Sequence, residues 1–252
     1  MRVVFLNSKS IHEGNLVLVN RHHPLRQEID PDKLVPVDEK HTAILLHSEA
    51  QTMLSRLLTL LDAKDGIVPV SGYRSLQEQE TIFQDSLKEN GEEFTLKYVA
   101  LPNCSEHQTG LAIDLAENKA DIDFIRPDFP YSGICQEFRM EAAQFGFIER
   151  YQTGKEAVTG IAWEPWHFRY IGYPHSAIMQ QKQFSLEEYI EHLRDFPEHG
   201  QHLRFEDEGH AAEIFYIRAQ ESSVTTVSLP DELPYQLSGN NVDGWVCTLW
   251  RK

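Results

Sequence analysis

Apolar and polar positions in the first part of the chain predict a strand, a helix and a second strand in turn. The short apolar stretch 15–20 is the first strand candidate. Between 39 and 62 the apolar residues recur at helical spacing, which predicts a helix. The run IVPVSGYR at 67–74 follows a turn signal and is typical of a strand. No internal repeat accompanies this order.

A second helix is expected directly after that strand. Ser75 can cap its first turn, and Glu78 stands at the capping-box position three residues later. The pair Asn90-Gly91 is expected to end the helix. The segment 110–116, GLAIDLA, then has the continuous apolar character of a buried strand.

In the second half of the chain the predicted secondary structure changes near Pro197. Before it, the pattern predicts helices at 135–145 and 174–196 with a strand at 167–172. After it, short β-rich segments follow one another at 213–220, 224–229 and 244–250. We therefore expect a domain over 1–197 and a small β-rich appendage over 198–252.

Composition and charge exclude some classes of function. The chain has 252 residues and a formal net charge of −16, so nucleic acid and anionic membrane surfaces are poor partners. It has no signal-peptide core and no apolar stretch near the roughly 18 residues that span a bilayer, which predicts a cytoplasmic protein without a membrane anchor. Three cysteines, none in a Cys-x-x-Cys pair, do not indicate a disulfide framework or a thiolate zinc site.

Two short segments have spacing suited to a metal site. In SEHQTGLAID, His107 and Asp114 can meet across a turn that enters a strand, with Gly110 permitting the bend. In EPWH, His167 would arrive from a neighbouring strand and complete a His-Asp-His set. A hydrolytic zinc ion takes three such ligands and keeps one position for water. Glu164 could then act on that water as general base and later as general acid.

Spacing alone leaves a structural interpretation open. Asp114 can cap a turn, and His107 and His167 can be hydrogen-bonded core residues. A buried carboxylate in the apolar run around Asp114 does need a partner, and a metal is one. The role of Arg74, which stands between the predicted strand and the next helix, is equally undecided. Its side chain can face a developing oxyanion or form a structural ion pair.

Three motifs, taken in order, resemble one family. They are SGYRS at 71–75, S-x-H-x-x-G-x-A-x-D at 105–114 and E-x-W-H at 164–167. Together they are similar to the D-alanyl-D-alanine metallopeptidases, the VanY-type carboxypeptidases, over about residues 14–180. The resemblance implies an α+β fold in which helices pack around a mainly antiparallel sheet that carries zinc. Residues 1–197 would then be the zinc peptidase domain.

The resemblance also implies roles for individual residues. One zinc ion per chain would be held by His107, Asp114 and His167. Glu164 would be the catalytic base, and Arg74 would polarise the scissile carbonyl. Two residues, Gln79 and Ser105, match positions that bind substrate, including its terminal carboxylate. Two others, Tyr98 and Trp166, would be walls of the pocket.

The lack of an anchor resembles the cytoplasmic vancomycin-resistance enzymes that combine VanX and VanY activities. We therefore expect a D,D-peptidase that hydrolyses the D-Ala-D-Ala dipeptide, trims the terminal D-Ala of peptidoglycan precursors, or does both. An L,D-carboxypeptidase or a phage-type endopeptidase is the alternative. A non-catalytic zinc module, as in hedgehog domains, ranks lower because Glu164 and Arg74 complete the catalytic set. The sequence does not predict the oligomeric state.

Overall fold

The computed structural model describes residues 1–207, 209–220 and 224–251. The chain forms two compact units. Unit 1 combines Met1–Leu18 with Leu186–Lys252, and unit 2 is Val19–Ser185. This division differs from the predicted one, because the N-terminal segment joins the C-terminal unit and that unit begins before Pro197. None of the described helices is both long and apolar enough to span a membrane.

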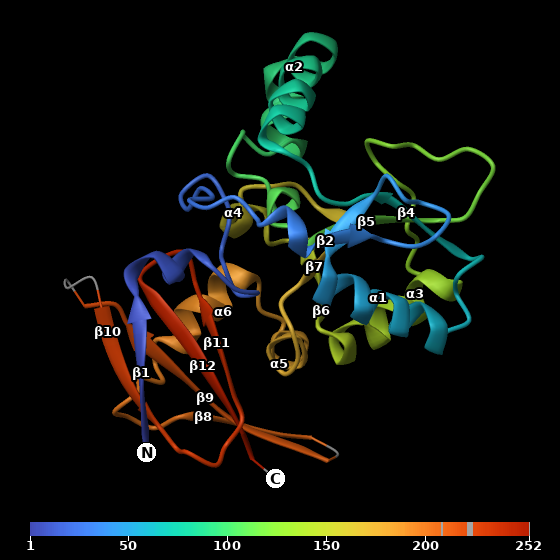
Figure 1. Ribbon diagram of the computed structural model, residues 1–252. Helices are drawn as coiled ribbons and strands as arrows, with labels where there is room; N and C mark the ends of the chain where they lie inside the picture. The colour runs from blue at the N-terminus through green and yellow to red at the C-terminus, as the bar shows by residue number, and fades with distance from the viewer. Residues whose placement is uncertain (208, 221–223, 252) are drawn as a thin grey trace. The chain divides into compact units, whose positions relative to one another are not determined.

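A four-stranded antiparallel sheet is the centre of unit 2 (Figure 1). In spatial order its strands are β4 (Ile67–Ser71), β5 (Ala112–Glu117), β7 (Glu164–Tyr170) and β6 (Phe147–Tyr151). A separate two-stranded hairpin pairs β2 (Leu34–Pro36) with β3 (Leu45–His47). The predicted α+β class with a mainly antiparallel sheet is confirmed, and β6 is an addition to the predicted strands.

The helices of unit 2 fall largely where periodicity predicts them. They are α1 (Ser48–Leu60), α2 (Leu76–Tyr98), α3 (Gly133–Ala142), α4 (Glu156–Thr159) and α5 (His175–Lys182), with 3-10 turns η2 (Pro31–Lys33), η3 (Glu106–Thr109) and η4 (Ala143–Phe145). The helix predicted over 39–62 begins only at Ser48, because β3 occupies the residues before it.

The core of unit 2 lies between one face of the sheet and the helices α1 and α3. Leu54 and Leu57 of α1, Phe138 of α3, Ile113 of β5 and Phe168 of β7 are all fully buried there. Side chains alternate between the two faces of a strand, so the residues next to these on β5 and β7 point to the opposite face. That opposite face carries the candidate ligands.

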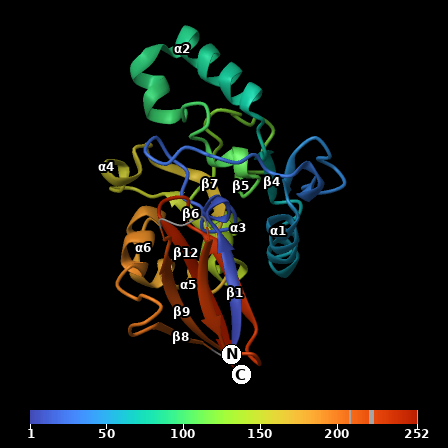
Figure 2. The ribbon, with the colours of Figure 1, turned by 60° about the vertical axis from the view of Figure 1, so that its left-hand side comes forward.

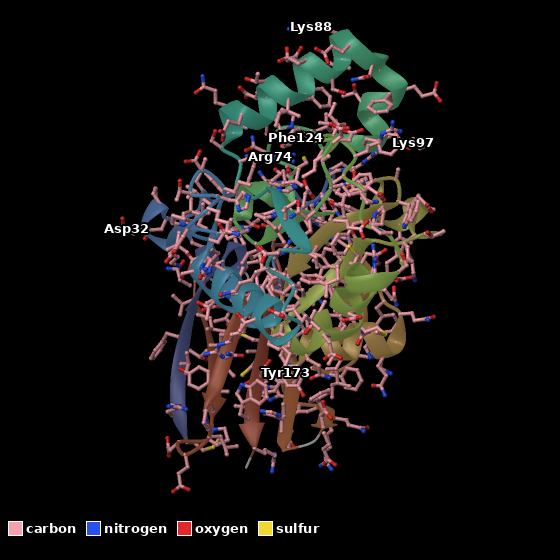
Figure 3. All side chains as sticks on the ribbon, turned by 90° about the vertical axis from the view of Figure 1, so that its right-hand side faces the viewer. Asp32, Arg74, Lys88, Lys97, Phe124 and Tyr173 are labelled. Carbon is pink, nitrogen blue, oxygen red and sulfur yellow. The ribbon has the colours of Figure 1, made fainter. Side chains whose placement is uncertain are left out.

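Helix α2 is bent into two arms, which Figure 2 shows. Gly91 has φ 80° and ψ 171°, outside the helical region, so the predicted stop there is a bend after which the helix resumes. The capping box of Ser75 and Glu78 is confirmed. In Figure 3, Lys88 lies near the bend and Lys97 on the shorter arm.

Unit 1 is mostly antiparallel sheet. It contains β1 (Arg2–Asn7) paired with β10 (Val224–Leu229), a four-stranded sheet in the order β11 (Tyr235–Gly239), β12 (Gly244–Arg251), β9 (His210–Arg218), β8 (Leu203–Asp207), the turn η1 (Ser8–His12) and the helix α6 (Leu186–Leu193). The three β-rich segments predicted after Pro197 are therefore confirmed as strands.

The prediction of a strand at 15–20 is wrong. Leu16 and Leu18 are 1% and 4% exposed, but the segment is irregular. The backbone of Leu18 is instead held within unit 1, where its N–H donates to Asn240 and its carbonyl accepts from the Asn241 side chain. Burial, rather than strand pairing, explains why this stretch is apolar.

Candidate metal centre and active site

Asp114 and His167 meet because their strands pair in register. Asp114 on β5 and His167 on β7 stand directly opposite each other in the antiparallel ladder. Residues in that relation have neighbouring side chains. His167 Nδ1 lies 3.0 Å from Asp114 Oδ1. The sheet itself therefore brings together two of the three predicted ligands.

His107 reaches the same point from η3. Gly110 ends that turn with φ 69°, the left-handed conformation that the predicted bend needs. His107 Nδ1 lies 2.7 Å from the carbonyl oxygen of Gly72. Because a carbonyl oxygen only accepts, Nδ1 carries the proton and Nε2 is left as the ligand atom. A glycine at position 72 lets the backbone that carries this carbonyl pass close to β3, since a Cβ there would lie 2.3 Å from the Leu45 carbonyl oxygen.

The three residues have the geometry of a metal site. Their ligand atoms all lie within 4.8 Å of one another, and all three side chains are buried. His107 Nε2 is 3.2 Å from Asp114 Oδ2. Ligand atoms about 2.0–2.2 Å from a tetrahedral metal lie about 3.3–3.6 Å apart, close to this spacing. Asp114 Oδ1 makes no hydrogen bond within the described part of the chain, so an acceptor is available to a cation.

Glu164 stands beside the ligand group at the start of β7. It is 6% exposed, and its Oε2 is 3.8 Å from His167 Nδ1. Burial, with the charge of Asp114 adding to it, raises the pKa of Glu164 to about 8. A carboxyl group with that pKa can take up and release a proton near neutral pH, as general acid–base chemistry requires.

The ligands themselves differ in charge. Burial, with Arg74 nearby, lowers the pKa of His107 to about 4, so this ring is neutral at ordinary pH. Burial opposes ionisation of Asp114, but His107 and His167 outweigh it and hold the pKa of that carboxyl well below its usual range. A neutral imidazole and a carboxylate are the forms that bind a divalent metal. Burial lowers the pKa of His167, but its contacts with Asp114 and Glu106 outweigh burial and raise that pKa to about 9, so a metal bound there would displace a proton from the ring.

Arg74 lies where β4 leads into α2, and Figure 3 labels it at the base of that helix. Its Nε donates to Ser71 Oγ at 2.9 Å, and its Nη2 lies 3.1 Å from Asp114 Oδ2. The side chain is 22% exposed. A fixed guanidinium therefore adjoins the ligand group while staying accessible from outside.

The other predicted contact residues have different surroundings. Gln79 is 1% exposed and its Nε2 donates to the carbonyl oxygen of Ala100. Ser105 is buried at the residue before η3, without a capping hydrogen bond from its side chain. Tyr98 packs on Phe94 at the end of α2, with ring centroids 4.8 Å apart.

Trp166, predicted as a pocket wall, packs in the core. It is 9% exposed and belongs to the core cluster of unit 2, together with Phe168 and Tyr170 of the same strand. His167 lies between them in sequence and points to the other face of β7. Strand alternation therefore gives Trp166 a packing role, and its place in a pocket wall stays a prediction.

Sequence reasoning missed residues that lie next to the ligands. The Tyr151 ring packs against His167 with centroids 4.8 Å apart, and Glu106 Oε2 lies 3.5 Å from His167 Nε2. Glu106 directly precedes the ligand His107 in the chain, and this position was the sequence signal that could have pointed to it. Tyr151 also lines a pocket of unit 2 with Asn20, Arg21, Leu96, Val99, Ala100, Leu101, Cys104, Thr159 and Ile161.

A family model described as VanY, D-alanyl-D-alanine carboxypeptidase, matches residues 43–173. The matched range contains the candidate ligands, Glu164 and Arg74. The chain belongs to the VanY family. Within the VanY family, it is 41% identical over 181 residues to the bifunctional D-Ala-D-Ala dipeptidase and D-Ala-D-Ala carboxypeptidase VanXYC of Enterococcus gallinarum, covering 71% of this chain and 95% of that relative.

Two solved structures extend the comparison. The vancomycin-resistance D,D-dipeptidase VanXYg, in complex with a D-Ala-D-Ala phosphinate analog, matches with a TM-score of 0.96 and 51% identity over 99% of both chains. A mutant of the vancomycin-resistance D,D-pentapeptidase VanY from a VanB-type cassette, in complex with Zn(II), matches with a TM-score of 0.59 and 26% identity, over 70% of this chain and 98% of that one. The match to VanXYg therefore extends over unit 1 as well as unit 2.

Proposed function

We propose that this chain is a zinc-dependent D,D-peptidase that hydrolyses the D-Ala-D-Ala dipeptide, removes the terminal D-Ala of peptidoglycan pentapeptide precursors, or does both. The observation that carries the proposal is the buried group of His107, Asp114 and His167 with Glu164 beside it, in a chain of the VanY family. Its similarity to VanXYC and VanXYg supports a D-Ala-ended substrate and a role in vancomycin resistance.

Zinc fits the donor set best. Two imidazole nitrogens and one carboxylate, with space left for water, are the ligands of catalytic zinc sites. The buried Asp114 Oδ1 without a hydrogen bond among the described residues supports a cation there. When bound, zinc would act as a Lewis acid on the scissile carbonyl and would make water more acidic.

The chain's own residues would move the protons. Glu164 takes a proton from the attacking water and then delivers it to the leaving amine of the last D-residue. Its buried position and raised pKa suit both steps. Arg74, held by Ser71 and Asp114, donates to the carbonyl oxygen as negative charge develops on it.

Replacing Arg74 with methionine should lower kcat for D-Ala-D-Ala by about 10²-fold, since one fixed donor to an oxyanion has about that effect. The ligand set remains, so zinc content should be retained. Steady-state kinetics with metal analysis of the same preparation checks both. Arg126→Met, at an exposed arginine of the same unit, is the control. An unchanged kcat would show that Arg74 is a structural ion-pair residue.

Substrate preference separates the proposal from its alternatives. We expect release of D-Ala from D-Ala-D-Ala, from UDP-muramyl-pentapeptide, or from both, when each is incubated with the purified chain. Release of D-Ala from UDP-muramyl-tetrapeptide alone would instead assign an L,D-carboxypeptidase, and cleavage of cross-linked wall alone would assign an endopeptidase.

Gln79 and Ser105 remain the proposed contacts of the substrate's terminal carboxylate. The cytoplasm, where these precursors are made, remains the proposed location.

A further inference from the structure

Behind the ligand His167 lies a buried cluster of charged side chains that the proposed reaction does not use. Glu106 of η3 is 1% exposed, Arg150 of β6 is 1% exposed, and Arg169 of β7 is fully buried. Charged residues are almost never found at such burial unless they are paired. The cluster therefore needs an explanation.

The two arginines hold one oxygen of the glutamate. Arg150 Nε donates to Glu106 Oε1 at 2.8 Å, and Arg169 Nη1 lies 2.9 Å from the same oxygen. Two guanidinium groups on Oε1 determine how the carboxylate is turned. As a result Oε2 points to the His167 ring, where it lies 3.5 Å from Nε2.

The His167 ring thus has a carboxylate oxygen near each of its nitrogens. Nδ1 lies 3.0 Å from Asp114 Oδ1 on the metal side, and Nε2 faces Glu106 on the other side. At this distance the two atoms make no hydrogen bond, and neither atom makes another one within the described residues. Because a carboxylate only accepts, a ring proton on Nε2 would satisfy both atoms and leave Nδ1 to bind metal. A carboxylate that orients a ligand histidine in this way strengthens metal binding.

The chain order ties the two ligands together. Glu106 directly precedes His107 in η3, so one short turn supplies a ligand and also orients the ligand from β7. His107 is oriented by a backbone carbonyl, that of Gly72, whereas His167 depends on a side chain. A substitution of Glu106 can therefore remove the contact with His167, whereas a substitution of Gly72 would leave the backbone carbonyl that contacts His107.

We propose that Glu106, fixed by Arg150 and Arg169, is the positioning residue that orients His167 for metal binding. The inference rests on the metal site of the proposed function. The rival explanation is that the cluster only stabilises the fold between η3, β6 and β7. The two differ in what they predict for metal affinity.

The test is the zinc dissociation constant of Glu106→Gln, measured by chelator competition on the full chain. Glutamine keeps the shape but offers one oxygen in place of two, so it cannot satisfy both the arginines and His167. We expect zinc to bind about 10- to 100-fold more weakly, the usual effect of losing such a partner. Gln108→Met is the matched control, because Gln108 is buried on the same turn and its Oε1 makes no hydrogen bond within the described residues.

A dissociation constant for Glu106→Gln within about threefold of the wild type, or an equal weakening in Gln108→Met, would overturn the inference. If Glu106→Gln does not fold, ¹⁵N NMR of the zinc-loaded wild type decides: an exchange-protected proton on His167 Nε2 supports it, and a proton exchanging freely overturns it. A wild type that binds no zinc would instead defeat the proposed function itself.

Discussion

Glu164→Ala should lower the turnover of D-Ala-D-Ala by at least about 10²-fold, the contribution typical of a general base. Zinc content should stay at that of the wild type, because Glu164 is beside the ligands and not one of them. The carboxylate is buried 3.8 Å from His167 Nδ1, so no exposed acid can substitute for it without entering the site. Kinetics and metal analysis on the same preparation measure both quantities.

Two companion variants sharpen this prediction. Glu164→Gln keeps the shape and hydrogen bonding but cannot take up a proton, so its loss should match that of alanine. Glu156→Gln changes an exposed glutamate of α4 and should have no effect. If Glu164→Ala turned over substrate as fast as the wild type, another group would have to be the base.

His107→Ala should have a larger effect, because it removes the metal itself. Without His107 Nε2 only Asp114 and His167 remain as ligands, and two protein ligands do not make a catalytic zinc site. We expect zinc to be lost on dialysis and D-Ala release to fall to the uncatalysed background. Metal analysis after dialysis is the direct measurement.

The control for this variant is another histidine of the same unit. His22 is exposed and belongs to no metal-ligand group among the described residues, so His22→Ala should keep both zinc and activity. Full zinc content in His107→Ala would mean that the ion is bound elsewhere. A variant that lost activity with zinc still bound would assign His107 a role in the reaction and not in coordination.

The ligand group could be proposed from sequence because its spacing is local and its motifs, taken in order, resemble one family. His107 and Asp114 are seven positions apart, across a turn whose glycine signals the bend, and β5 is apolar enough to predict as a strand. His167 was found through the short motif that holds Glu164. Only the register of β5 with β7, which places Asp114 opposite His167, required the structure.

Long-range pairing explains what could not be predicted. β1 pairs with β10, more than 200 residues later, and no local pattern encodes such a partner. The domain boundary was misplaced for the same reason. The packing of Trp166 could not be predicted from its motif, because strand alternation turns its side chain into the core. Glu106 was overlooked because its partners come from β6 and β7.

The most direct test of a zinc D,D-peptidase is D-Ala release from D-Ala-D-Ala by the purified chain before chelation, after chelation and after zinc is restored. We expect release that disappears with the metal and returns when about one zinc ion per chain is bound, as expected for a single three-ligand site. Release that persists after complete removal of metal, or no release from the zinc-loaded chain on either D-Ala-D-Ala or the pentapeptide precursor, would contradict it.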